Sequence, residues 1–279
     1  MDEQSQTMKI EPSQRVLYAH NPLAEVVCQA RFEKLPDLSE EEVEELKAAF
    51  TAAGYPTCTE EISFGYIRQL TPHEAAAKAP VPLPETHIYR FNSLDGVWRI
   101  SLCSEFVALT CYKYSGWSDY LPRILNACQI FFERHPAALP LRLGLRYKDV
   151  IERGPIGLED VPWHELIQPF LLGPLSPNAL AVGQIASDEE VENFLSQSLL
   201  KLDGAMLLLQ SSVLVSVNGQ DRAFLIDADF YKEENLDVDA FKKISALESL
   251  LESLHSYAGA LFRRAITERL HNALRPSTI

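Results

Sequence analysis

The feature that most constrains this chain is the alternation of apolar and polar residues that runs through most of two segments, LPLRLGLRYKDVI (139–151) and RAFLIDADFY (222–231). Successive side chains of a strand point to opposite faces, so each segment would present one apolar and one polar face. The segment LAEVVCQARF (23–32) follows a similar pattern. This pattern predicts an antiparallel sheet with one face buried and the other in contact with solvent.

Helices are expected between these strands. In SEEEVEELKAAFTAAG (39–54), Ser39 and Glu42 form a capping-box pattern, and Gly54 is a suitable residue to end the helix. The first half continues with expected strands and one helix. The strands are 62–70, 87–92, 97–102 and 106–112, and the helix is 117–135, with Pro122 placed in its first turn.

The second half is expected to repeat this order. After the strand 139–151 come a partly helical stretch over 158–172, four strands, and helical material over 238–274 with a bend or break near 256–259. The four strands are 179–186, 194–202, 205–214 and 222–231.

The predicted fold class is therefore α+β, with two pseudo-repeats of strand-helix-four strands-helix. They would form a curved antiparallel sheet covered by helices on one face. The expected organisation is a flexible tail over 1–14, a first repeat over 15–136, and a second repeat over 137–279 with a long C-terminal helical region. The element order resembles the duplicated TATA-binding-protein-like arrangement, and a helix-grip ligand-binding fold is the alternative.

Charge and cysteine content limit the possible partners and compartments. With Lys+Arg 25 and Asp+Glu 39, the formal net charge is −14, which disfavours nucleic acid and anionic membrane surfaces as partners. No apolar stretch reaches the length of a membrane-spanning helix. The N-terminal segment lacks the features of a signal peptide. The five cysteines form no metal-binding or disulfide pattern, so a reducing cytoplasm is expected.

The polar face of the sheet carries the candidate binding residues. Arg31, Arg146, Asp227 and Asp229 would share this face if the apolar faces meet the helices. One interpretation is a groove for a polar ligand or peptide, because the planar guanidinium suits carboxylate or phosphate. The other, which the residues favour, is a solvated face joined by cross-strand ion pairs. Because Arg142 and Lys148 fall on the same face, the argument against nucleic acid is weaker there.

Catalytic and metal sites find less support in the sequence. Asp227-x-Asp229 could bind a divalent metal, but no further acidic cluster completes the ligand set, so neither a metal nor a cofactor is expected. His255 lies at the edge of a leucine-rich helix face and is a weak candidate binding residue, expected to contact a backbone carbonyl. No nucleophile elbow, zinc-protease motif or phosphate-binding loop is present in the sequence.

Three segments, NPLAEVVCQARF (21–32), LRLGLRYKDVI (141–151), and FLIDADF (224–230) with LHSYAGALFRRAITERL (254–270), resemble a sporadically distributed bacterial family of uncharacterised proteins. The resemblance implies no established activity. Its patchy distribution fits an antitoxin, immunity or phage-defence accessory protein.

The sequence therefore predicts a non-catalytic cytoplasmic protein that binds a protein partner. One alternative is a sensor of a small anionic ligand in a cleft between the sheet and the terminal helix. Another is a metal-dependent hydrolase that uses Asp227, Asp229 and Arg146.

Overall fold

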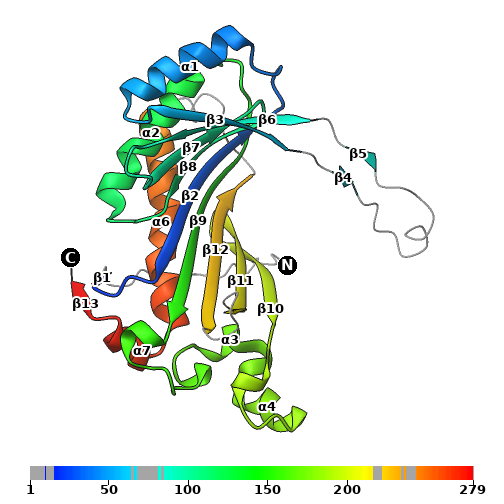
Figure 1. Ribbon diagram of the computed structural model, residues 1–279, viewed down its shortest axis with the longest axis vertical. Coiled ribbons are helices and arrows are strands. Elements are labelled where there is room, and N and C mark those ends of the chain that lie inside the picture. Colours follow the sequence, from blue (N-terminus) through cyan, green and yellow to red (C-terminus); the bar gives the residue numbers. More distant parts are fainter. Residues whose placement is uncertain are drawn as a thin grey trace, which may run out of the picture.

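A large antiparallel sheet organises the protein, and helices pack against it (Figure 1). The computed structural model describes residues 10, 16–63, 66–67, 81–82, 85–215, 222–233, 236 and 243–278. The nine strands of the main sheet run in the order β10-β11-β12-β9-β2-β8-β7-β6-β3, and every neighbouring pair is antiparallel. The protein is thus of the α+β class.

The strands have the following bounds. They are β2 (Leu23–Phe32), β3 (Thr57–Ser63), β6 (Thr86–Asn92), β7 (Trp98–Leu102), β8 (Phe106–Cys111), β9 (Pro140–Glu152), β10 (Leu195–Leu202), β11 (Ala205–Val215) and β12 (Arg222–Lys232). Two small sheets accompany them, formed by β1 (Val16–Tyr18) with β13 (Pro276–Thr278) and by β4 (Tyr66–Ile67) with β5 (Val81–Pro82).

The longer helices are α1 (Glu40–Ala52), α2 (Trp117–Arg134) and α6 (Ile244–Ala265). The shorter ones are α3 (Pro169–Leu172), α4 (Pro177–Gly183) and α7 (Glu268–Ala273), with single 3₁₀ turns at Gly154–Ile156, Trp163–Glu165, Gly173–Leu175 and Asp188–Glu190.

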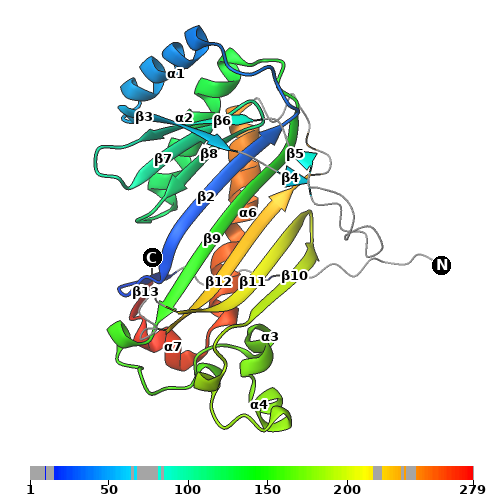
Figure 2. The ribbon, with the colours of Figure 1, turned by 45° about the vertical axis from the view of Figure 1, so that its right-hand side comes forward.

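The three long helices cover the same face of the sheet. Ring contacts join α1 to β6 (Phe50–Phe91), α2 to β2 (Phe32–Phe131) and α6 to β12 (Phe230–Tyr257). The strand residues in these contacts all belong to the apolar set that the register places on one side. We call this side the covered face. On the other side, the open face, no helix of the described residues is seen in either view (Figures 1 and 2).

One hydrophobic core spans both halves of the chain. Buried residues of 15–136 and 137–279 belong to a single cluster, and β2 pairs with β9 at the centre of the sheet. Within 1–14 the structure describes only Ile10, which is buried in that core. The remainder of the expected tail lies outside the described residues.

The sequence placed most elements of the first half correctly. Strand β2 has the expected bounds, and Ser39 and Glu42 form the capping box of α1 with both of its hydrogen bonds. Gly54 follows the helix with φ +98°, a conformation that suits glycine. The strand expected over 62–70 starts earlier than predicted: β3 begins at Thr57 and ends at Ser63, and β4 covers Tyr66–Ile67. Residues 64–65 and 68–70 lie outside the described residues. Pro122 lies in the second turn of α2, not in the first.

Two predictions for the second half are wrong. The strand expected over 179–186 is the helix α4, with Ser176 as its N-cap and Pro177 at its first position. The second half therefore shows three strands between β9 and α6 among the described residues, where four were expected. The terminal helix does not break near 256–259, because α6 runs unbroken to Ala265 and α7 follows. Its expected start at 238 lies outside the described residues.

The two ends of the described chain lie together. Strand β1 pairs with β13, and the Tyr18 hydroxyl is 2.9 Å from Nδ1 of His271 in α7. The pairing joins the segment before β2 to the end of the helical layer. No helix of the described part is both long and apolar enough to span a membrane.

Candidate functional site

A ladder of ion pairs crosses the centre of the open face, on strands β2, β9 and β12. Arg146 donates from Nε to Asp227 Oδ1 at 2.6 Å and from Nη2 to Oδ2 at 2.5 Å. Arg142 donates from Nη2 to Asp229 Oδ2 at 2.7 Å. Lys148 Nζ is 3.1 Å from Glu25 Oε1 on β2. Three cations of β9 are thus each paired with a carboxylate of a neighbouring strand.

Strand register explains the partners in this ladder. The residue directly opposite Asp227 is Lys148, and the residue directly opposite Asp229 is Arg146. Arg146 instead reaches the diagonal Asp227, a separation that a long side chain can span on one face of a sheet. Lys148 pairs across the other edge of β9, with the directly opposed Glu25.

Burial of the Arg146–Asp227 pair is unequal. The Asp227 side chain is 5% exposed and that of Arg146 is 40% exposed. The hydrogen bond with Asp227 raises the pKa of Arg146 further above its usual value, against the opposing effect of burial. Asp227 is therefore neutralised by an always-charged partner, whose Nη1 takes no part in the pair.

Arg142 lies flat over the open face. Its guanidinium stacks on the Tyr231 ring, with Cζ 4.2 Å from the ring centroid, and Nε is 3.4 Å from Glu233 Oε1. A Cβ atom at Gly144 would clash with Nη1 of Arg142. The absence of a side chain at Gly144 therefore gives Arg142 the space it occupies.

Arg31 shares this face but stands apart from the ladder. Its Cα partners are Arg142 on β9 and Phe106 on β8, and its side chain is exposed. It forms no ion pair with any of the residues that the structure describes. A second arginine directly opposite also adds like charge at this point.

His255 does not belong to the open face. It stacks on Trp117 of α2 with ring centroids 4.1 Å apart, and its Nδ1 is 2.8 Å from the Tyr147 hydroxyl. Tyr147 follows Arg146 in β9 and so points to the covered face. The structure thus brings Arg146, Asp227 and Asp229 together on the open face, with Arg31 on the same face but apart from them. His255 lies on the covered face.

The covered face holds a buried carboxyl group that sequence analysis did not single out. Asp149 of β9 is 8% exposed. Burial, with a further contribution from the charge of Asp227, raises its pKa to about 8. Its place in the alternating pattern was visible in the sequence, since Tyr147, Asp149 and Ile151 share one face.

The geometry limits what the aspartates can do chemically. Both carboxylate oxygens of Asp227 accept hydrogen bonds from Arg146, so a cation could bind there only by displacing a fixed positive charge. Within the described ranges, no cluster of three His, Cys, Asp or Glu residues is suited to hold a metal ion. The contacts of Arg146, Asp227 and Asp229 are therefore ion pairs between neighbouring strands, as in the second of the two interpretations given for this face.

No protein-family model matches the chain, and a search of curated proteins finds no match. Among solved structures, the chain is aligned with an RNA triphosphatase of S. pombe. That alignment covers 94% of this chain and 88% of the other, at 6% sequence identity and a TM-score of 0.14. A TM-score of that size gives no information about fold or activity.

Proposed function

We propose that this chain is a non-catalytic binding protein that engages a protein partner through the open face of its sheet. The observation that carries the proposal is an exposed apolar strip beside the ion-pair ladder. The strip consists of Leu195 and Leu199 of β10 with Leu208 and Leu214 of β11. Register places all four on the side that carries Asp229.

Exposure of the strip is large for leucine. Leu195 is 66% exposed, Leu199 is 59% exposed and Leu214 is 39% exposed. Leu199 and the partly buried Leu208 are directly opposed, and Gln197, Gln210 and Ser212 lie between this pair and the other two leucines. Exposed apolar side chains interspersed with polar ones are found in many protein interfaces. The strip would supply the buried centre of such an interface, and the ladder its polar border.

Charge indicates what kind of protein surface fits. The molecule carries −14 overall, whereas the ladder beside the strip contains the half-exposed Arg146, and Arg31 lies farther along the same face, on β2. Both can donate hydrogen bonds to a carboxylate. We therefore propose a partner that presents apolar side chains next to an Asp or Glu. Nucleic acid remains disfavoured, because three of the cations on this face are already paired.

The order of the strands supports an internal repeat. From the central pair β2–β9, the sheet continues through β8, β7, β6 and the edge strand β3 on one side and through β12, β11 and β10 on the other. On each side the neighbour of the central strand is the last strand before a long helix, α2 or α6. We infer from this that the two halves are copies of one unit in a TATA-binding-protein-like arrangement.

Biological context rests on the sequence. The resemblance of 21–32, 141–151, 224–230 and 254–270 to a sporadically distributed bacterial family favours an antitoxin, immunity or phage-defence accessory role. Four of the five free thiols are buried, which agrees with the proposed cytoplasmic location.

A photo-cross-linking experiment tests the proposed surface. A photoreactive amino acid at Leu199 should yield one discrete adduct in host cells, and the same residue at Leu94, an 85% exposed leucine in the β6–β7 turn, should not. The partner recovered from the adduct should bind the purified chain. Leu199→Glu should then weaken binding at least about tenfold, and Leu94→Glu should leave it unchanged. Equal adducts from both positions, or equal affinities of both variants, would contradict the proposal.

A further inference from the structure

A cavity of about 640 Å³ opens where β9 ends and β12 begins, away from the ion-pair ladder. Its lining includes Arg153, which follows β9, Arg222, which starts β12, and Glu189 on the 3₁₀ turn Asp188–Glu190. These residues lie far apart in the sequence and belong to different elements, so no local motif connects them. The cavity was not foreseen from the sequence.

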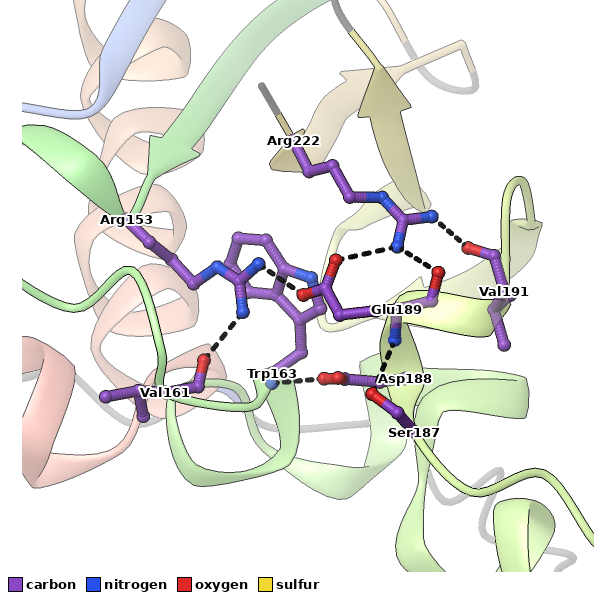
Figure 3. A network of polar contacts seen from close by, with 8 residues as sticks. All are labelled: Arg153, Val161, Trp163, Ser187, Asp188, Glu189, Val191 and Arg222. Atoms are coloured by element: carbon purple, nitrogen blue, oxygen red, sulfur yellow. Dashed lines mark hydrogen bonds and ion pairs between the residues drawn. The ribbon is translucent and has the colours of Figure 1, made fainter. Parts of the chain in front are cut away.

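Two guanidinium groups converge on one carboxylate in this cavity (Figure 3). Nη2 of Arg153 is 2.5 Å from Oε1 of Glu189, and Nη1 of Arg222 is 3.0 Å from Oε2. The side chains of Arg153 and Arg222 are 9% and 12% exposed, whereas that of Glu189 is 48% exposed. Two nearly buried cations thus share a single anion that remains in contact with solvent.

Each arginine also has contacts that do not involve the Glu189 side chain. Nη1 of Arg153 donates to the Val161 carbonyl at 2.8 Å, and its Cζ lies 4.5 Å from the centroid of the Trp163 ring. Arg222 donates from Nη2 to the carbonyl of Val191 and from Nη1 to that of Glu189 at 2.7 Å. The two guanidinium groups are therefore positioned by backbone carbonyls and an aromatic ring. Because both are nearly buried, they need an anion beside them whether Glu189 or a ligand supplies it.

The Glu189 carboxylate occupies the position that a ligand carboxylate would take. It accepts one charge-assisted hydrogen bond from each arginine, the usual way in which arginines hold a carboxylate. Burial works to raise the pKa of Glu189, but the hydrogen bonds from Arg153 and Arg222 outweigh it and hold the pKa below its usual value. The Glu189 carboxylate is thus ionised near neutral pH, and it would compete with a ligand carboxylate for the two arginines.

Other lining residues of the cavity carry the opposite charge. Glu152, Glu159 and Asp160 also line it, are exposed, and form no ion pair with any residue in the described part of the chain. A ligand with only negative charge would be repelled by these carboxylates. A ligand with only positive charge would form no favourable interaction with the two arginines. The charge pattern fits a molecule with a carboxylate at one end and a cation at the other.

We propose that this cavity is a binding site for an amino acid with a basic side chain. The ligand's α-carboxylate displaces Glu189 from Arg153 and Arg222, and its cationic side chain faces Glu152, Glu159 and Asp160. The site is separate from the partner surface on the open face, so either could exist without the other.

Calorimetric titration of the full chain tests the proposal with four probes. Lysine and arginine should bind, whereas cadaverine, which lacks the carboxylate, and glutamate, whose side chain is anionic rather than cationic, should not. Glu189→Gln removes the competing charge and should tighten lysine or arginine binding about tenfold, since a hydrogen bond to a charged group is worth about that factor. Glu190→Gln, on the same turn but without contact to either arginine, is the matched control and should behave as the wild type.

Different results are expected if the ion pairs of Glu189 with Arg153 and Arg222 only stabilise the fold. In that case Glu189→Gln would lower the melting temperature, and neither lysine nor arginine at millimolar concentration would raise it again. That result would overturn the proposal, as would equal binding of glutamate and lysine, or identical affinities of the Glu189→Gln and Glu190→Gln variants.

Discussion

Arg146 and Asp227 form a two-point ion pair across β9 and β12, although the sheet register sets Lys148, not Arg146, opposite Asp227. The pair joins a half-exposed cation to a buried anion. The effect of a substitution on the free energy of unfolding should therefore depend on which of the two partners is removed.

Removing the cation of this pair should destabilise the fold. Arg146→Gln leaves the buried Asp227 carboxylate without its partner, and we expect a loss of about 2 kcal/mol in the free energy of unfolding, because a buried unpaired charge is costly. Adding Asp227→Asn should restore most of the loss. Urea denaturation measures both. Lys47→Gln, which breaks the exposed pair with Glu44 on α1, should lower stability much less than Arg146→Gln does. Equal losses for Arg146→Gln and Lys47→Gln would contradict the prediction.

Gly144→Ala should act through Arg142. The new methyl group would occupy the space of the guanidinium and break its contact with Asp229, at a cost of about 1 kcal/mol. In an Arg142→Gln background the same substitution should be neutral or stabilising, because alanine suits a strand better than glycine. A double-mutant cycle by urea denaturation measures the coupling. Gly154→Ala, where a Cβ would meet no atom within 4 Å, serves as the control. Simple additivity of the two changes would refute the mechanism.

Stability should depend on pH through Asp149. Its pKa is about 8 in the folded protein, whereas an aspartate in an unfolded chain titrates near pH ~4. Between these values the folded state holds a proton that the unfolded state has released. The contribution of Asp149 to the free energy of unfolding is therefore fully present below pH ~4 and is lost as the pH rises through 8. Over this range the free energy of unfolding falls by up to about 1.4 kcal/mol per pH unit.

Asp149→Asn provides the comparison for this pH dependence. The variant cannot ionise at this position, so its stability should exceed that of the wild type increasingly as pH rises from 5 to 8. Unfolding in urea at several pH values gives the two curves. Parallel curves would show that Asp149 does not titrate in this window.

Ser39→Ala should weaken α1. The substitution removes the acceptor for the Glu42 backbone N–H and one partner of the Glu42 carboxylate. We expect a loss of about 1 kcal/mol by urea denaturation. Thr51→Ala, at an exposed position near the other end of α1, should leave stability unchanged or raise it slightly. A loss at Thr51 equal to that at Ser39 would argue against capping as the cause.

The sequence predicted the elements whose signals are local. The Ser39–Glu42 capping box and the alternation in 23–32 and 222–231 each specify one element and one face, and the structure agrees with them. Arg146, Asp227 and Asp229 could be assigned to one face for the same reason. Their exact pairing could not be assigned, because it depends on the register between β9 and β12.

The two wrong predictions for the second half have different causes. The apolar run over 179–186 resembles a strand, but Ser176 and Pro177 just before it form a local helix start, which outweighs the strand preference. Residues 256–259, where a break is expected from the sequence, include Gly259, yet α6 continues through it, because Leu254 and Leu261 on either side are buried in the core. The cost of one glycine is about 1 kcal/mol, less than the burial of such leucines contributes.

The pairing of β2 with β9 has a consequence for dissecting the molecule. Residues 135–139, between α2 and β9, connect the two halves, so a cut there would leave each fragment with a central strand lacking its neighbour. Such bare strand edges favour association. The halves should therefore behave as a split protein, poorly soluble when produced separately and able to reconstitute the sheet when produced together.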